Sequence, residues 1–223
     1  MRSRGKFITI EGLDGCGKST QLERLAHVLR HQGLDVVVTR EPGGTETGEK
    51  IRGLLLASGT ADLAPMAELA LMFASRAQHL KEVILPALSQ GKIVLCDRFT
   101  DSTEAYQGGG RKLGSEPVLA LHRILCAGIQ PELTIFMDSD PNASIERARR
   151  RNATRSNTAQ TDENRFEQES RAFFGRVRGA YLAIAQREPQ RVVVVDARHS
   201  ADDTHSKIVS LVQARLKSAA KTA

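Results

Sequence analysis

The sequence has no tryptophan, and aromatic residues of all kinds make up only 4% of its 223 residues. Its three cysteines lie far apart and follow no metal-binding pattern, so we expect neither disulfides nor a zinc site but a reduced, cytoplasmic setting. No apolar run approaches the roughly 18 residues that cross a membrane. The apolar run 7–10, after the basic N-terminus, is too short for a signal peptide. These absences favour a soluble cytoplasmic protein.

Positive charge is in modest excess, with 32 Lys+Arg against 26 Asp+Glu and a net charge of +6. Such an excess attracts polyanions, so nucleic acid, acidic membranes and phosphorylated metabolites all stay open as partners. A chain of 223 residues that is 40% hydrophobic can bury one good core. We therefore predict a single domain over residues 1–223.

Short apolar, β-branched runs alternate with longer helical patterns along the chain. This alternation predicts an α/β fold with a five-stranded parallel sheet flanked by helices and ligands at the carboxyl ends of the strands. The predicted strands are 7–10, 36–39, 93–96, 133–137 and 192–195, and the clearest predicted helices are 21–31, 67–89 and 117–127. The residues that directly follow the strands are polar or charged: Glu11, Arg40, Asp97, Asp138 and Asp196.

Residues 12–19, GLDGCGKS, match the phosphate-binding pattern G-x-x-x-x-G-K-[ST], between a predicted strand and a predicted helix. Glycines let backbone N–H groups converge on phosphate oxygens, and the N-terminus of the helix adds positive potential. Lys18 suits the β- and γ-phosphates, and the hydroxyl of Ser19 suits Mg²⁺. The residues predicted to bind ATP are Gly12, Leu13, Asp14, Gly15, Cys16, Gly17, Lys18, Ser19 and Thr20.

Cys16 is unusual within this loop. A thiol near a helix N-terminus and Lys18 is expected to have a lowered pKa. One hypothesis is that Cys16 is oxidisable and that ATP shields it. The alternative is that it only fills a small space in the core.

Further motifs supply residues for a second pocket, which a phosphotransferase needs and a hydrolase does not. In TREPGG, residues 39–44, an arginine precedes a tight turn. In DRF, residues 97–99, Asp97 is suited to hold Mg²⁺ through water, and Arg98 can bridge two phosphates. Phe73 and Arg76 share a helix face and suit a base, although such a pair also occurs as core plus a snorkelling arginine. Residues 103–110, TEAYQGGG, lead from polar side chains into a mobile glycine run.

Together, GLDGCGKST, TREPGGT, LMFASRAQH, DRFTDSTEAYQGGGR, the arginine-rich stretch after residue 146 and FEQES resemble bacterial thymidylate kinases. The resemblance runs from about residue 6 to residue 197. It implies the P-loop nucleoside monophosphate kinase fold with a mobile lid, transfer of the γ-phosphoryl of ATP to dTMP with Mg²⁺, and a homodimer packed through helices.

The resemblance also implies roles for single residues. Phe73 would stack on thymine, Arg76 would donate to its O4, and Thr103 and Gln107 would face its other polar edge. Tyr106 would crowd the 2′ position of the sugar and so favour deoxyribose. Asp14 would accept a hydrogen bond from the 3′-hydroxyl of the sugar. Arg40, Arg52 and Arg98 would hold the monophosphate. The substrate-binding residues other than those that face the base and the 2′ position are therefore Asp14, Arg40, Glu41, Arg52 and Arg98.

The lid implied by the resemblance spans about 147–165. Arg147 would lie against adenine, and Arg149 or Arg151 would join Lys18 and Arg98 in catalysis. Gly15 stands where one subgroup of the family carries arginine, which fits a lid-supplied arginine. The insertion 152–161 is longer than usual, so Arg165 remains a candidate too.

By composition alone, 147–164 has no apolar periodicity and predicts a polar, partly disordered loop, and the tail is expected to fray over 218–223. Two alternatives remain. Another nucleoside monophosphate or deoxynucleoside kinase would share the fold, and dUMP would satisfy the same hydrogen bonds as dTMP. The second alternative is a P-loop ATPase or switch that binds nucleic acid. The positive residues argue against it, because they do not lie along a helix with interleaved aromatics, as they would in a nucleic-acid-binding surface. We therefore expect neither nucleic acid nor membrane as a partner.

Overall fold

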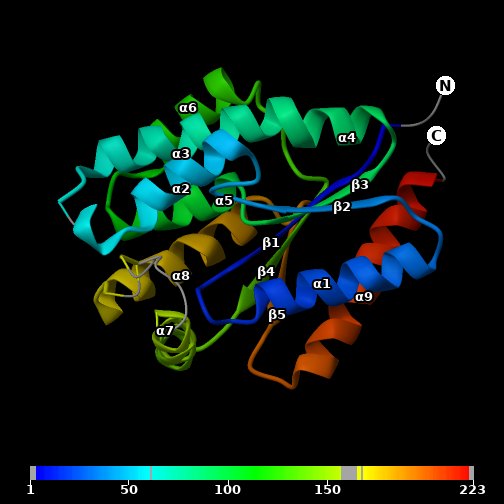
Figure 1. Cartoon of the computed structure of the whole chain (residues 1–223). Coiled ribbons are helices and arrows are strands. Elements are labelled where there is room, and N and C mark those ends of the chain that lie inside the picture. Colours follow the sequence, from blue (N-terminus) through cyan, green and yellow to red (C-terminus); the bar gives the residue numbers. More distant parts are fainter. Residues whose placement is uncertain (1–3, 61, 157–164, 167, 221–223) are drawn as a thin grey trace.

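The computed structural model describes residues 4–60, 62–156, 165–166 and 168–220. Its centre is a five-stranded parallel sheet with the strand order β2-β3-β1-β4-β5 (Figure 1). The predicted strands are confirmed, and each extends by one or two residues into the polar position that follows it. Their bounds are β1 Phe7–Gly12, β2 Val36–Arg40, β3 Ile93–Asp97, β4 Leu133–Asp138 and β5 Val192–Asp196.

Helices follow the strands in the order that the alternating pattern predicts. The α-helices are α1 Lys18–His31, α2 Glu46–Leu56, α3 Pro65–His79, α4 Leu85–Ser89, α5 Thr100–Thr103, α6 Ser115–Leu125, α7 Pro141–Ser156, α8 Arg171–Arg187 and α9 Ala201–Ala220. A 3-10 turn, η1 Ser58–Thr60, and two π-helical segments, η2 Leu80–Ile84 and η3 Glu104–Gly110, lie between them. None of the helices among the described residues is both long and apolar enough for a membrane span.

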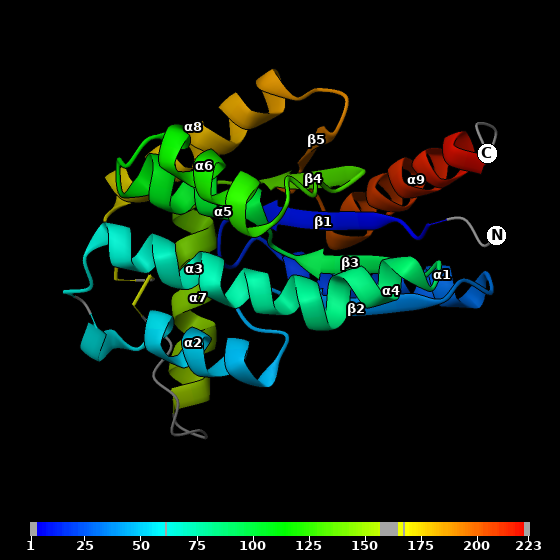
Figure 2. The same ribbon diagram turned by 90° about the horizontal axis from the view of Figure 1, so that it is seen from above.

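The sheet is covered on both faces, which explains the near-continuous apolar strands. Leu25 of α1 and Val212 of α9 pack with Ile10 and Ile135 on one face. On the other face, helices α3, α4, α6 and α8 cover the remaining strand side chains. In Figures 1 and 2, α2, α3 and α7 gather at the end of the molecule away from both termini, which is the carboxyl end of the strands.

The strand register brings the polar strand ends together. Asp97 pairs in register with Ile10 on one side and with Arg40 on the other. The phosphate-binding loop that follows β1 therefore lies beside the motifs that end β2 and β3. The core thus positions three separate sequence motifs at one edge.

Three local expectations are corrected. The predicted helix 67–89 is interrupted by the π-turn η2, just before Pro86, which has no N–H to donate to the carbonyl of Glu82. The arginine-rich stretch forms helix α7 as far as Ser156, since arginine and alanine favour helix and Pro141 suits the first turn. The tail is helical to Ala220. The rest of the predicted lid, 157–164, and residues 221–223 lie outside the described residues.

The glycine run 108–110, expected to be mobile, lies in η3 against α8, with Gly108 and Gly110 buried. A Cβ at Gly110 would lie 2.5 Å from the ring of Phe173, and one at Gly109 would lie 2.7 Å from Ala180. Glycine is therefore needed here for the close packing of η3 against side chains of α8 rather than for mobility.

Candidate active site

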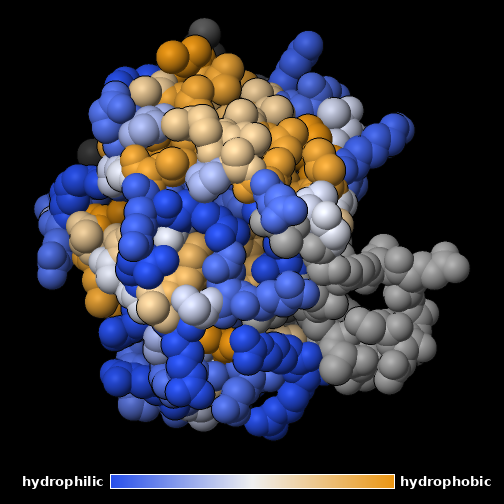
Figure 3. Space-filling view, turned by 90° about the vertical axis from the view of Figure 1, so that its left-hand side faces the viewer, coloured by the Kyte–Doolittle hydropathy of each residue, from blue (hydrophilic) through white to orange (hydrophobic). Residues whose placement is uncertain are grey.

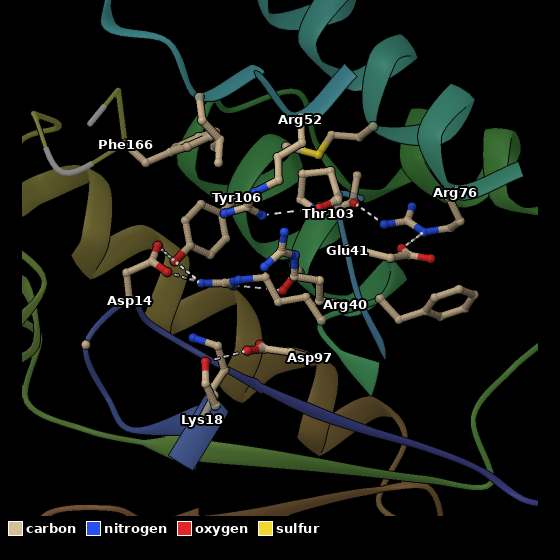
Figure 4. A pocket seen from close by; sticks show the side chains of 18 of the residues that line it. Asp14, Lys18, Arg40, Glu41, Arg52, Arg76, Asp97, Thr103, Tyr106 and Phe166 are labelled. Carbon is tan, nitrogen blue, oxygen red and sulfur yellow. Dashed lines mark hydrogen bonds and ion pairs between the residues drawn. The ribbon is translucent and has the colours of Figure 1, made fainter. Parts of the chain in front are cut away.

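A cavity of about 540 Å³ opens at the carboxyl edge of the sheet. It extends from the P-loop, residues 12–19, to the facing sides of α3 and η3 (Figure 4). Most of the predicted ATP- and substrate-binding residues line it: Asp14, Gly15, Gly17, Lys18, Ser19, Thr20, Arg40, Glu41, Arg52, Arg76, Asp97, Arg98, Thr103, Tyr106 and Gln107. Residues from six segments of the chain thus meet in one pocket.

The P-loop folds over the ammonium group of Lys18. Its Nζ donates to the carbonyl oxygens of Gly12 at 3.1 Å and Leu13 at 2.9 Å. Gly15 has φ +80°, and a Cβ there would collide with the carbonyl oxygen of Ser144 at the start of α7. Glycine is therefore required at this position both for backbone conformation and for space.

Cys16 occupies the core beneath this loop and does not line the cavity. Burial raises the pKa of its thiol, although Lys18 lowers it in part. The expected low thiol pKa is therefore wrong, because desolvation outweighs the nearby positive charge.

Ser19 and Asp97 lie together at the floor of the pocket. The hydroxyl of Ser19 donates to Oδ2 of Asp97 at 3.0 Å. The other oxygen, Oδ1, is buried and has no hydrogen-bond partner among the described residues. A hydroxyl and a carboxylate with a spare oxygen are the hard ligands that Mg²⁺ accepts, so the pair fits this ion.

Arg98 occupies the centre of the pocket on a left-handed backbone, with φ 73°. Its Nη2 donates to Asp14 at 2.8 Å and to the hydroxyl of Tyr106 at 3.1 Å, and its Nη1 donates to Ser102 at 2.9 Å. Burial lowers the pKa of Arg98, but Asp14 and the phenols of Tyr106 and Tyr181 raise it well above its usual value. The guanidinium is thus a fixed cation between the P-loop and η3.

The carboxylate of Glu41 holds Arg76 at the far end of the pocket. Arg76 Nε donates to Glu41 at 2.6 Å and Nη2 to Thr103 at 2.8 Å, while His79 lies 2.9 Å from the other oxygen of Glu41. Burial raises the pKa of Glu41, but Arg76 and His79 more than compensate and lower it. Nη1 of Arg76 is buried without a partner among the described residues.

Phe73 does not face the pocket, contrary to expectation. Its side chain is 0% exposed and packs in the core, with Arg76 Cζ 4.7 Å from the centre of its ring. Met72 lines the pocket instead. It lies four residues before Arg76, and this spacing places the two side chains on the same helix face more closely than the three-residue spacing of Phe73 and Arg76 does here. The aromatic rings that line the pocket are Phe99, Tyr106 and Phe166.

The π-helix η3 directs Tyr106 and Gln107 into the pocket. The hydroxyl of Tyr106 donates to Asp14 at 3.2 Å, and its ring packs edge-on against Phe166. Gln107 donates its amide nitrogen to Glu68 at 2.7 Å, and its amide oxygen is buried without a partner among the described residues.

Arg40 and Arg52 lie near the mouth of the pocket. Arg40 is exposed and donates to Glu49 at 2.9 Å, and Arg52 donates to the carbonyl of Pro42 at 3.2 Å. Their guanidinium groups add positive charge to the side of the cavity opposite the P-loop (Figure 4).

The predicted lid arginines lie in different places. Arg147 Nε donates to the carbonyl of Gly15 at 2.8 Å, and Arg149 is exposed on α7. The side chain of Arg151 lies outside the described residues. Arg165 is buried, does not line the cavity, and donates to Leu55 and Glu68, which leaves it unsuited to swing over phosphates.

Several residues at the site had no assigned role in the sequence. Glu11 accepts from the backbone of Phe99 at 2.7 Å and from the hydroxyl groups of Ser102 and Tyr181. Its position near the end of the predicted strand β1 could have marked it in the sequence as a residue of the site. Glu68 carried no signal, because a single carboxylate on a helix gains a partner only through the tertiary structure.

The fold and the site together define a P-loop nucleoside monophosphate kinase: a parallel sheet, a phosphate-binding loop, and a polar pocket facing it. Residues 10–208 match the family model described as thymidylate kinase. Thymidylate kinases from Pelobacter propionicus and Pseudomonas putida are 47% and 49% identical, in each case over 93% of this chain, and over 94% and 95% of the relatives. The crystal structure of thymidylate kinase from Ehrlichia chaffeensis superposes with a TM-score of 0.74 at 31% identity, covering 94% of this chain and 99% of that one.

The chain therefore belongs to the thymidylate kinase family. It is an ATP-dependent enzyme that phosphorylates dTMP to dTDP. The alternative of an ATPase or switch that binds nucleic acid is set aside by this membership.

Proposed function

We propose that ATP binds over the P-loop, that dTMP binds between α3 and η3, and that Arg98 lies between the two phosphates. The observation that carries this proposal is the position of Arg98, which reaches Asp14 of the P-loop and Tyr106 of η3 at once. Lys18 would hold the β- and γ-phosphates of ATP. The acceptor is already an anion, so catalysis consists of alignment and charge neutralisation, and no histidine base is needed.

The base would be read by two unpaired buried groups. Nη1 of Arg76 is a donor suited to O4 of thymine, and Oε1 of Gln107 is an acceptor suited to N3–H. Uracil offers the same edge, so these groups do not separate dTMP from dUMP. Met72 rather than Phe73 would contact the base from α3, and Phe166 and Tyr106 supply the aromatic surface.

Arg40 and Arg52 would bind the monophosphate together with Arg98. Each guanidinium is a planar donor fork that matches phosphate oxygens. Asp14 would accept from the 3′-hydroxyl. Because Asp14 holds Arg98 in the present structure, the carboxylate would divide its hydrogen bonds between the two when dTMP binds.

Mg²⁺ would be held by Ser19 and Asp97, with the phosphates of ATP as its other ligands, and would neutralise charge on the transferred group. No cluster of three or more His, Cys, Asp or Glu side chains suited to a metal occurs among the described residues. A site with few protein ligands is typical of Mg²⁺ held mainly by a nucleotide. Titrating Mg²⁺ against the wild type and Asp97→Asn tests this: the variant should need more Mg²⁺ for half-maximal rate.

Arg149 and Arg151 remain the proposed catalytic arginines of the lid, and Arg147 would lie against adenine. Arg151→Ala should slow transfer far more than it weakens dTMP binding, by about a thousandfold if it acts like an arginine finger. Unchanged turnover would move the role to Arg149 or Arg150.

We propose further that the enzyme is a cytoplasmic homodimer. The three cysteines are free and buried, as suits a reducing compartment. Apolar side chains are exposed on three helices: Met66 of α3, Leu85 of α4, and Ile124 and Leu125 of α6, of which Ile124 is 75% exposed. An apolar area is also visible in the upper part of Figure 3. Light scattering of the wild type and Ile124→Glu tests this, since a dimer through this face should dissociate in the variant.

A coupled assay that follows ADP release tests the acceptor. With ATP alone the release should be slow, and it should rise on addition of dTMP or dUMP but not of dCMP or dGMP. Equal release with and without dTMP would contradict the proposed two-pocket arrangement.

A further inference from the structure

Glu68 of α3 is a fully buried carboxylate beside the pocket, with 0% exposure. It accepts from Nε2 of Gln107 at 2.7 Å, from Nε of Arg111 at 3.2 Å and from Nη2 of Arg165 at 2.5 Å. Two guanidinium groups neutralise its charge, which makes burial of a carboxylate tolerable. Glu68 itself does not line the cavity, whereas Gln107 does. Gln107 is the hydrogen-bond partner of Glu68 that itself lines the cavity, so it offers the most direct route from Glu68 to the bound base.

The contact with Glu68 fixes which way round the amide of Gln107 lies. A carboxylate only accepts hydrogen bonds, so the NH₂ group of Gln107 must face Glu68 and the amide oxygen must face away from it. That oxygen belongs to a residue that is 1% exposed, and it has no partner among the described residues. Gln107, a residue that lines the pocket, therefore keeps an unpaired acceptor, and not an unpaired donor.

Arg76 is arranged in the complementary way. Glu41 accepts a hydrogen bond from Nε of Arg76, and Thr103 accepts one from Nη2. Nη1 is therefore the donor of Arg76 that has no partner among the described residues. An unpaired donor and an unpaired acceptor thus belong to two residues that line the same pocket. Each costs free energy when buried until a ligand pairs with it.

We propose that Glu68 is a positioning residue that makes the pocket selective for a pyrimidine with an N–H beside a carbonyl, by holding the amide of Gln107 in one orientation. Thymine and uracil present this edge. Cytosine presents the reverse, with its amino group toward Nη1 of Arg76 and its ring lone pair toward Oε1 of Gln107. Two like groups would then face each other, which disfavours cytosine. The inference rests on the proposed binding of the base between α3 and η3.

The experiment compares wild type with Glu68→Gln on dTMP, dUMP and dCMP, measuring kcat and KM for each. A glutamine at position 68 can donate or accept, so the amide of Gln107 is free to turn over. The ratio of kcat/KM for dTMP over dCMP should fall about tenfold or more, mainly through KM. The ratio for dTMP over dUMP should stay within about twofold, because these two bases share the edge that is read.

A double-mutant cycle shows whether Glu68 acts through Gln107. In a Gln107→Met background, Glu68→Gln should change the dTMP/dCMP ratio by less than about twofold, because the amide is already gone. Arg111→Gln is the matched control. It removes a different partner of Glu68 outside the pocket, so it should lower thermal stability and leave the ratio unchanged. If Glu68→Gln does not fold, the double variant Glu68→Gln/Arg111→Gln, compared with Arg111→Gln alone, keeps the charge balance of the site.

An unchanged dTMP/dCMP ratio in a folded Glu68→Gln enzyme would overturn the proposal, as would an equal effect of Glu68→Gln with and without Gln107. Either result would leave phosphorylation of dTMP by the wild type intact. Failure of the proposed pocket itself would appear separately, as a wild-type enzyme that uses dCMP as readily as dTMP.

Discussion

The guanidinium of Arg98 and the carboxylate of Asp14 are joined at 2.8 Å across the centre of the active site. Asp14 belongs to the P-loop, and Arg98 directly follows β3 on the side of the pocket proposed for dTMP. Arg98 reaches this position from a backbone with φ 73°, a conformation that costs free energy for a residue with a side chain. This ion pair therefore links the P-loop directly to the side of the pocket proposed for dTMP.

Replacement of Arg98 should affect turnover more than binding. Arg98→Met should lower kcat by about a thousandfold, because charge on the transferred phosphoryl group loses its central cation. Arg98→Lys should restore only part of the rate, since it keeps the charge but lacks the planar fork that reaches Asp14 and Tyr106 together. Steady-state assays with saturating ATP and varied dTMP separate kcat from KM.

A half-buried arginine outside the pocket serves as the control for Arg98. Arg24 of α1 pairs with Asp202, and Arg24→Gln should leave kcat unchanged. If Arg98→Met raised KM for dTMP while kcat stayed near the wild-type value, Arg98 would be a binding residue and its proposed place between the phosphates would be wrong.

Tyr106 allows the sugar preference to be split into ring and hydroxyl contributions. The ring packs against Phe166 and Phe173, and the hydroxyl contacts Arg98 and Asp14. Tyr106→Phe should keep the preference for dUMP over UMP, because the ring still crowds the 2′ position. Tyr106→Ala should raise the relative kcat/KM for UMP by about tenfold, because the crowding is gone. Loss of the preference in Tyr106→Phe would show that the hydroxyl, and not ring size, excludes ribose.

Glu11 should make stability depend on pH near neutrality. Burial, with a smaller effect of Asp101, raises its pKa from 4.5 to about 7, against the lowering effects of Ser102 and Arg98. Between those two values the folded state binds one more proton than the unfolded state. The free energy of unfolding should therefore fall as the pH rises through this window, by on the order of 3 kcal/mol in total.

Urea unfolding of the ligand-free enzyme measures this effect. The unfolding curves are recorded between pH 5 and pH 8, at pH values about one unit apart. Glu11→Gln has no titrating group at this position, so its curve should be flatter than that of the wild type over the same range. Glu46→Gln, at an exposed position on α2, is the control and should run parallel to the wild type. Parallel curves for Glu11→Gln and the wild type would refute the shifted pKa.

Gly15 should tolerate no side chain. A Cβ at this position, where φ is +80°, would collide with the backbone of Ser144. Gly15→Ala should therefore raise KM for ATP by about tenfold or more through displacement of the P-loop, and Gly15→Arg should be worse despite its added positive charge. Gly33→Ala has a similar φ of +78° with open space around it, so it should cost some stability but not ATP affinity. Equal KM values for Gly15→Ala and Gly33→Ala would contradict this explanation.

The cysteines should be unreactive in the folded enzyme. Burial raises the pKa values of all three thiols: that of Cys126 to about 11, that of Cys96 well above its usual value, and that of Cys16 despite Lys18. A thiol reagent at neutral pH should modify all three after unfolding and none within minutes before it, with or without ATP. Rapid modification of Cys16 that ATP suppresses would restore the idea of a redox-sensitive thiol.

The strands were predictable because burial on both faces leaves near-continuous apolar runs, which are visible in the sequence. The helical state of 147–156 was not predicted, because a polar helix that packs through residues such as Ile145 and Ala148 shows little apolar periodicity. Phe73 was misplaced for a related reason. The spacing of residues along a helix does not tell whether Met72 or its neighbour Phe73 faces a ligand. The packing of the core decides this, because it buries Phe73.

The sequence by itself determined the phosphate-binding loop, because glycines, a lysine and a serine at fixed spacing act locally on the backbone between Gly12 and Ser19. It also determined the five strands and the motifs that follow them. Only the tertiary structure decided how these motifs meet: Arg98 with Asp14, Arg76 with Glu41, and Gln107 with Glu68. These pairs are 84, 35 and 39 residues apart in the chain, and a buried carboxylate selects its partner through the packing of whole elements, which no local pattern encodes.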